Sequence, residues 1–199
     1  MIFSKVVYLS YPITKNTPRY GNQGPLEIKR TRQISAGNTS NNSELRFSAH
    51  LGTHIDAPFH FDEKGQTIDH YPPEFWICTN PYLIYYPANP EEIIGKETLM
   101  DQLTSIQNDC DCLLIKTDFS RFRNDREETY IFHNPGLAPD LCQWIRTNTK
   151  IRMIGFDFIS HDESKYANKV AKIFDTDHVN HILSKKDILN ILPVLPSTY

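Results

Sequence analysis

The sequence predicts a single mixed α/β domain, and three observations support this prediction. Strand-like and helix-like segments alternate in the second half of the chain, whereas the first half holds strand-like segments and loops. The chain has 199 residues, the size of one ordinary domain. Its hydrophobic content of 39% and charged content of 23% are typical of a globular protein. We therefore expect one domain over residues 1–199, but not a simple doubly wound sheet.

The first half of the chain is expected to contain β-strands connected by long polar loops. Strands are predicted at residues 5–9, near 26–29, at 46–50 and at 82–86. A turn is expected at Tyr11 and Pro12. Residues 14–43 scatter Asn, Thr, Gly and Pro among charges, which predicts a long loop around one strand. Pro87 ends the last of these strands, because proline cannot donate a backbone hydrogen bond.

The second half is expected to alternate between helices and strands. Helices are predicted over residues 96–107, from Pro139 onward and over 177–186, with strands at 112–117, 151–156 and 188–192. Leu99, Leu103 and Ile106 repeat at helical spacing and form an apolar stripe. Pro139 suits the first turn of a helix. Residues 118–132 are strongly charged and are expected to be exposed.

Composition and charge exclude several classes of function. The net charge of −3 argues against nucleic-acid binding and against a polybasic membrane anchor. No apolar stretch approaches the roughly 20 residues needed to span a bilayer, and no basic leader with an apolar centre is visible. None of the four cysteines forms a C-x-x-C pair, which agrees with a cytoplasmic protein without a zinc ribbon. Cys110 and Cys112 either bind a ligand together or simply flank the start of a buried strand.

Residues 50–60 carry the strongest chemical signal, because they place three imidazoles and one carboxylate in eleven positions. His and Asp side chains are ligands of zinc, manganese and ferrous iron. His54 and Asp56 are two residues apart, so on extended backbone they face the same side. His50 lies four residues before His54, and Gly52 between them permits a turn that other residues resist. This spacing predicts a metal site.

His60 is the candidate for proton transfer at this site. Three protein ligands and one open position are the pattern of a catalytic zinc, whereas four closed ligands form a structural site. Water bound to such an ion becomes a nucleophile near neutral pH, and the reaction then needs a proton shuttle. Imidazole titrates near about 6.5 and can fill this role. Pro58 restricts Ala57 to extended geometry and so fixes the path to His60. The alternative is that His60 is a fourth ligand.

The same segment resembles a known family. It matches every fixed position of H-x-G-T-H-x-D-x-P-x-H, the signature of the metal-dependent cyclase-like hydrolases, which include bacterial-type kynurenine formamidases and isatin hydrolases. Four more segments resemble this family: LSYPI at 9–13, KTDF at 116–119, HNPGL at 133–137 and GFDFIS at 155–160. Order and spacing fit over residues 6–195.

The resemblance implies an α/β domain with a central mixed, barrel-like β-sheet flanked by helices. It also implies metal-assisted hydrolysis of an amide, formamide or lactam bond in a small, often aromatic molecule. Carried over to this sequence, His50, His54 and Asp56 would bind the metal. His60 would be the acid/base, and His181 would correspond to a further, C-terminal metal ligand. We expect one divalent transition metal ion per chain, zinc or manganese.

The sequence departs from the family pattern at the second metal position. The family places a Glu twelve residues after the C-terminal His, where this chain has Pro193, which has no side-chain ligand. The second metal is therefore expected to be weak or absent, unless another acid substitutes: Asp177, Asp187 or Glu163. His178 and His181 lie three residues apart on a predicted helix, so both could reach one ion, and the resemblance selects His181.

Two other positions depart from the pattern. Asp118 stands where the family usually has Gly, and Tyr8 stands where many relatives carry Asp. Asp118 is expected to cap a turn, the alternative being a carboxylate near the pocket.

Two classes of function remain open from the sequence. The first is an enzyme, a metal-dependent amidohydrolase of arylformamidase type acting on a small-molecule substrate, which the intact His60 favours. The second is a degenerate family member that binds a ligand or metal without turnover, which Pro193 favours. Phe59, Tyr71 and Trp76 would either line an aromatic pocket or belong to the core. The resemblance also implies a homodimer or a dimer of dimers, with residues 14–43 near the partner.

Overall fold

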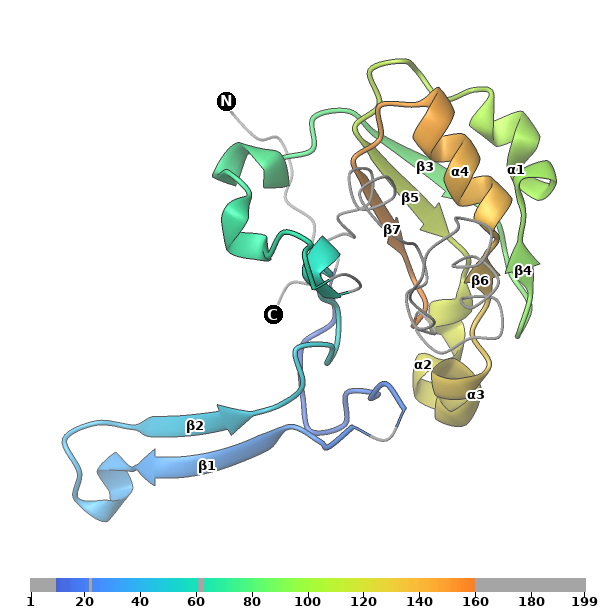
Figure 1. Ribbon diagram of the computed structural model, residues 1–199. Coiled ribbons are helices and arrows are strands. Elements are labelled where there is room, and N and C mark those ends of the chain that lie inside the picture. Colours follow the sequence, from blue (N-terminus) through green and yellow to red (C-terminus); the bar gives the residue numbers. More distant parts are fainter. Residues whose placement is uncertain (1–9, 22, 61–62, 160–199) are drawn as a thin grey trace, which may run out of the picture. The chain divides into compact units, whose positions relative to one another are not determined.

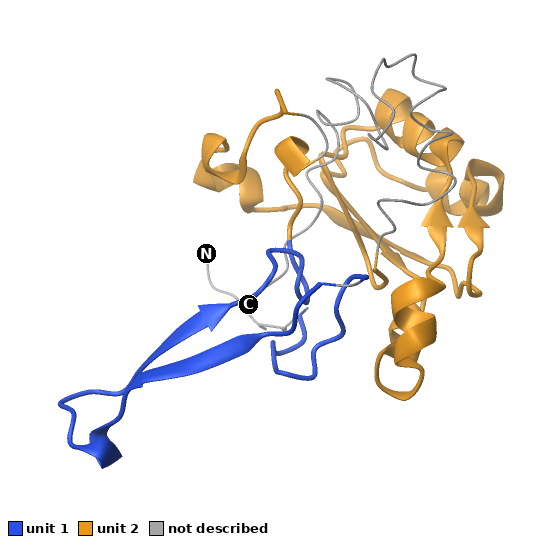
Figure 2. Cartoon of the chain, turned by 60° about the horizontal axis from the view of Figure 1, so that its bottom comes forward, with its two compact units in different colours: residues 1–54, 197–199 blue, residues 55–196 orange. Residues whose placement is uncertain are grey.

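The computed structural model describes residues 10–21, 23–60 and 63–159 of the chain. These residues divide into two compact units at the bond between His54 and Ile55 (Figure 2). The first unit consists mainly of a β-ribbon and loops, and the second contains a parallel sheet with helices. The described architecture is thus mixed α/β, and the single-domain assignment stays a prediction.

The first unit contains an antiparallel two-stranded ribbon (Figure 1). Strand β1 spans Glu27–Arg32 and strand β2 spans Asn42–Arg46. Every residue of the ribbon is exposed except Ser43, which is half-buried. The 3-10 helix η1, Ile34–Ala36, and Gly37 in a left-handed conformation turn the chain at the tip.

The two faces of the ribbon differ in chemistry. On one face, Lys29 and Glu44 form an ion pair with an N–O distance of 3.5 Å, and Arg46 approaches Glu27 to 3.9 Å. On the other face, Ile28 and Leu45 lie opposite each other and are 43% and 59% exposed. Side chains alternate between faces along a strand, and this alternation separates the charged pairs from the apolar pair.

The second unit is built on the parallel sheet β3-β5-β7 (Figure 1). Strand β3 spans Pro81–Tyr85, β5 spans Cys112–Lys116 and β7 spans Met153–Phe156. Pro81 lies opposite Cys112, which lies opposite Met153 on its other side. Because the three strands are parallel, the residues that follow them converge at one edge of the sheet.

Helices α1 and α4 cover one face of this sheet (Figure 1). Helix α1 spans Lys96–Leu103 and α4 spans Pro139–Asn148, with Pro139 in its first turn as expected. Each helix connects two neighbouring parallel strands, and right-handed crossovers place such helices on the same face. The core between helices and sheet contains fully buried aliphatic side chains: Ile84, Ile94, Leu99, Leu103, Leu113, Ile115, Leu141, Ile145 and Ile154.

Shorter elements complete the described part of the second unit. The 3-10 helices are η2 (Pro58–His60), η3 (Ile68–His70), η4 (Pro73–Trp76) and η5 (Phe119–Arg121). Helix α2 spans Phe122–Asp125 and α3 spans Glu127–Phe132. The short strands β4 (Ile93–Ile94) and β6 (Gly136–Leu137) pair in parallel.

Several sequence predictions differ from the structure. The strand expected at 46–50 is wrong, because β2 ends at Arg46 and residues 49–50 form a turn. The helix expected over 96–107 ends at Leu103, with turns closing through the backbone carbonyls of its last residues. The charged segment 118–132 is helical, and it contains the fully buried Phe119.

The sheets of the described residues are open, and barrel-like closure stays a prediction. The strands expected at 5–9 and 188–192 and the helix expected at 177–186 lie outside the described residues. Among the described residues, no helix combines the length and apolar character that crossing a membrane requires.

Candidate functional site

The predicted metal-binding segment begins with a tight turn in the first unit. The Leu51 amide donates to the Ser48 carbonyl at 3.0 Å, and the His50 amide donates to Ser48 Oγ at 3.2 Å. Gly52 has φ +74°, and a Cβ there would lie 3.2 Å from Cγ1 of Ile13. Both facts favour glycine, so the turn predicted between the first two histidines is confirmed.

His50 and His54 meet across this turn. Nδ1 of His50 lies 3.1 Å from Nε2 of His54, and the rings are nearly perpendicular. Nδ1 of His54 lies 2.9 Å from the Gly52 carbonyl, which accepts a hydrogen bond when this nitrogen carries the proton. In that tautomer the lone pair is on Nε2, the nitrogen that faces His50. Metal-binding histidines are typically oriented in this way by a backbone carbonyl.

His60 lies at the end of the 3-10 helix η2, which begins at Pro58. The His60 amide donates to the Ala57 carbonyl at 2.8 Å, and the Phe59 amide donates to the Gln66 carbonyl at 3.1 Å. Gly65 packs directly on this turn, because a Cβ there would lie 2.5 Å from the carbonyl carbon of Pro58. The backbone that carries His60 is therefore held by hydrogen bonds and by close contact with a glycine.

Within the continuous segment 50–60, His50, Asp56 and His60 each offer one ligand atom, and these atoms lie within 4.8 Å of one another. All three residues are half-buried. Two imidazoles and a carboxylate are a donor set that suits zinc or manganese, so the residues present fit a divalent cation. His54 is not in this group of three and instead faces His50.

His181, His178 and Pro193 lie outside the described residues, as do the acids considered as substitutes for the family's Glu.

An aromatic cluster follows the segment in the chain. Tyr71 lies 4.5 Å from Phe75 and 5.5 Å from Trp76, measured between ring centroids, and Phe75 lies 5.1 Å from Trp76. Burial raises the pKa of the Tyr71 hydroxyl. Of the three predicted aromatic residues, Tyr71 and Trp76 therefore lie together, while Phe59 is 53% exposed.

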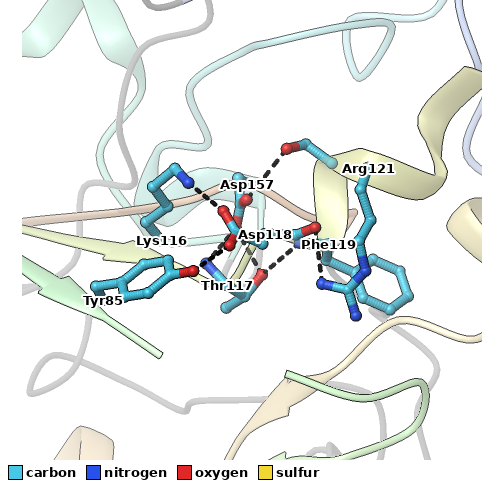
Figure 3. A network of polar contacts seen from close by, with 8 residues as sticks. Tyr85, Lys116, Thr117, Asp118, Phe119, Arg121 and Asp157 are labelled. Atoms are coloured by element: carbon cyan, nitrogen blue, oxygen red, sulfur yellow. Dashed lines mark hydrogen bonds and ion pairs between the residues drawn. The ribbon is translucent and has the colours of Figure 1, made fainter. Parts of the chain in front are cut away.

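A second group of polar residues gathers where β5 and β7 end (Figure 3). One carboxylate oxygen of Asp157 accepts from the Thr117 amide at 2.7 Å and from the Thr117 hydroxyl at 2.6 Å. The other oxygen accepts from the Ser120 hydroxyl at 3.2 Å. Thr117 is fully buried, so these bonds satisfy polar groups that water does not reach.

Asp118 occupies a left-handed conformation, with φ +55°. This backbone explains why glycine suits the position, since few other residues tolerate it. Asp118 lies at the N-cap position of η5, where its carbonyl accepts from the Arg121 amide at 3.1 Å, but its side chain makes no capping hydrogen bond. Its carboxylate instead accepts hydrogen bonds from the Lys116 ammonium and the Tyr85 hydroxyl (Figure 3). These two bonds hold the pKa of Asp118 below its usual range.

A family model described as putative cyclase matches residues 7–163. The chain belongs to the putative cyclase family. The match includes segment 50–60, and it confirms the family that the motifs indicate.

Curated relatives within the cyclase family include kynurenine formamidases. That of Geobacillus thermodenitrificans is 28% identical over 154 residues, covering 77% of this chain and 68% of the relative. That of Bacillus cereus strain ATCC 14579 is 27% identical over 159 residues, covering 80% of this chain and 71% of the relative.

Solved structures of similar fold include isatin hydrolase A from Ralstonia solanacearum. It aligns with a TM-score of 0.71 and 18% identity, covering 97% of this chain and 79% of that one. A potential metal-dependent hydrolase with cyclase activity aligns with a TM-score of 0.60 and 23% identity, covering 83% of this chain and 74% of that one. At these identities the similarity establishes the cyclase fold alone.

Sequence reasoning missed three supporting residues of the cyclase fold. Asp157 joins the ends of β5 and β7, and Gly65 supports the turn before His60. Asn134 is 4% exposed, donates to the Ile131 carbonyl at 3.0 Å and accepts from the Ile159 amide at 2.9 Å. Asp157 and Asn134 lie in motifs quoted for the resemblance, but their partners are distant in sequence. A signal for Asp157 was available in the sequence, because polar residues that directly follow neighbouring parallel strands meet at one edge of the sheet.

Proposed function

We propose that this protein is a metal-dependent hydrolase that cleaves the C–N bond of a small amide, formamide or lactam. The observation that carries the proposal is the group of His50, Asp56 and His60 in a segment that also bears His54. Relatives named kynurenine formamidase and fold neighbours named isatin hydrolase support this class of reaction and an aromatic substrate.

We assign metal binding to His50, His54, Asp56 and His181. The hydrogen bond from His54 Nδ1 to the Gly52 carbonyl supports Nε2 as a ligand atom. Its 3.1 Å separation from Nδ1 of His50 is close to the roughly 3.3 Å between two nitrogen ligands of one tetrahedral zinc ion. We propose one zinc or manganese ion per chain. Pro193 supplies no ligand, so a second ion binds weakly or not at all.

His60 is proposed as the acid/base. A divalent cation held at this segment would lower the pKa of a bound water and supply the nucleophile. His60 accepts a proton as water attacks the carbonyl carbon and then delivers a proton to the departing nitrogen. The close contact with Gly65 and the hydrogen bond to the Gln66 carbonyl support the backbone turn that carries His60. If His60 instead binds the cation, as its distance to His50 and Asp56 allows, another group must transfer the proton.

The proposed setting is cytoplasmic, with a small-molecule substrate and a homo-oligomeric protein. The cluster of Tyr71, Phe75 and Trp76 supports recognition of an aromatic substrate. The exposed apolar pair Ile28 and Leu45 supports contact with another copy of the chain.

Metal content tests the ligand assignment. We expect about one zinc or manganese ion per purified chain by plasma mass spectrometry, and clear loss of metal in His54→Ala. His70→Ala is the matched control, because His70 is an exposed histidine whose partners are Thr67 and Asp69. If His54→Ala retains its metal, the ligand assignment fails.

Hydrolysis tests the acid/base assignment. We expect the metallated protein to release formate from N-formyl aromatic amines, or to open an aromatic lactam. His60→Ala should retain metal and lose about 10²–10⁴-fold in kcat, the usual contribution of a positioned acid/base. Loss of metal together with activity would identify His60 as a ligand. A fully metallated wild-type protein that hydrolyses none of a broad panel of amides, lactams and esters would favour the degenerate binder.

A further inference from the structure

The four cysteines of the chain differ in exposure. Cys110, Cys112 and Cys142 are buried, whereas Cys78 is half-buried and is reached by solvent. Free thiols react as thiolates, so both access and local charge decide which one is modified.

The fold holds Cys78 beside the start of β5. On one side of Cys78, the Ile77 carbonyl accepts a hydrogen bond from the Arg152 guanidinium at 2.7 Å. On its other side, the Thr79 amide donates to the Asp111 carboxylate at 2.8 Å.

The two residues that bind the neighbours of Cys78, Asp111 and Arg152, adjoin Cys112 and its strand partner. Asp111 directly precedes Cys112 in the chain, and Arg152 directly precedes Met153, which lies opposite Cys112 in the sheet. Both neighbours of Cys78 are thus tied to residues adjoining Cys112.

Exposure makes the two thiols unequal, because Cys78 is half-buried and Cys112 is buried. The pKa of Cys78 is lowered, because a hydrogen bond from Cys112 and the Arg152 guanidinium outweigh the opposing effects of burial and of the Asp111 carboxylate. The same hydrogen bond and burial raise the pKa of Cys112. Because an oxidant can reach Cys78 and not the buried Cys112, Cys78 is the nucleophile of the pair and Cys112 is the partner behind it. Cys110 differs, because its thiol donates to the Cys112 carbonyl at 3.3 Å and burial raises its pKa.

We propose that Cys78 and Cys112 are a redox-sensitive thiol pair that hydrogen peroxide converts to a disulfide. The Cys78 thiolate attacks one peroxide oxygen, the O–O bond breaks, and the departing hydroxide takes up a proton. The resulting sulfenic acid is attacked by the sulfur of Cys112, which loses its proton as the S–S bond forms and water leaves. In total two thiols and one peroxide give one disulfide and two waters.

Peptide mapping of the full chain tests this pair. The protein is treated with one equivalent of hydrogen peroxide, its remaining thiols are alkylated, and it is cleaved before aspartates. Asp111 separates Cys110 from Cys112, so the linked partner can be identified. We expect a reducible link between the peptides starting at Asp69 and Asp111, and loss of two of the four free thiols.

Alkylation rates provide a test that needs no variant. Cys78 in the untreated folded protein should react with iodoacetamide at least about tenfold faster than Cys110 or Cys142, because those thiols are buried. Equal rates would overturn the assignment of Cys78 as the reactive thiol.

Matched variants separate the pair from the other cysteines. Cys78→Ser should abolish peroxide-induced disulfide formation, and Cys110→Ser should leave it unchanged. A link from Cys78 to Cys110, or a sulfenic acid on Cys78 that never becomes a disulfide, would contradict the proposal. These readouts do not depend on hydrolase activity or on bound metal.

Discussion

The ribbon β1-β2 and the sheet β3-β5-β7 are built on opposite physical principles. The ribbon exposes nearly all of its residues and pairs charges across one face. The sheet buries Ile84, Leu113 and Ile115 against α1 and α4. Isolated two-stranded ribbons are only marginally stable in water, whereas a sheet covered by helices has its own core. Stability within the second unit therefore comes from burial, and the ribbon contributes little unless another surface covers it.

A side-chain truncation in the core of the sheet should change the free energy of unfolding far more than a similar truncation on the ribbon. Ile115→Ala should lower the free energy of unfolding by about 2–5 kcal/mol, because Ile115 is 1% exposed and its loss leaves a cavity. Leu45→Ala, a similar truncation on the ribbon, should change it by less than about 0.5 kcal/mol, because Leu45 is 59% exposed. Urea unfolding monitored by circular dichroism measures both. A large effect of Leu45→Ala that depends on protein concentration would show that another chain covers the ribbon.

Acid should weaken the second unit through Asp111. Burial raises the pKa of this carboxyl, but hydrogen bonds from the Thr79 and Asn80 amides outweigh it, so the net pKa is lowered. A lowered folded-state pKa stabilises the fold above the unfolded value of about 3.9, and this stabilisation is lost as pH falls through the folded value. Asp111→Asn should cost about 1–3 kcal/mol at pH 7 and progressively less below pH 4. Equal destabilisation by this variant at pH 7 and pH 3 would contradict this account.

The ribbon ion pairs should have the smallest effect. Lys29 and Glu44 are 77% and 66% exposed in their side chains, so solvent screens their attraction. Lys29→Ala should change the free energy of unfolding by about 0.5 kcal/mol or less, and added salt should remove the difference. An effect above about 1 kcal/mol that persists in high salt would place this pair in a buried interface.

The same contrast explains which elements the sequence could predict. Residues 112–115 form a continuous apolar run bounded by polar residues, and β5, Cys112–Lys116, forms almost as expected. The strand near 26–29 was expected within a long polar loop region, and β1 extends further, to Arg32. Propensity did not place β2 correctly, because pairing with β1 sets its register and ends it at Arg46.

The candidate site was predictable in its residue types but not in its contacts. The motif at 50–60 indicates ligands, and Gly52 indicates the turn, because both signals are local. The contact of Gly65 with Pro58 depends on how the chain folds back, which no spacing rule gives. The Asp157 bonds to Thr117 likewise join two strand ends that only the sheet brings together.

The parallel order of β3, β5 and β7 also bears on how the chain reaches its fold. A ribbon such as β1-β2 joins neighbouring segments and forms in about 1–10 μs. The sheet must close residues 86–111 and 117–152 into crossovers before its strands can pair, so it forms later. Until then β3 is unpaired, and its apolar side chains can contact other molecules; Leu83 and Tyr85 are 57% and 51% exposed even in the folded chain. We therefore expect refolding yields to fall as protein concentration rises, with aggregates that begin at this strand.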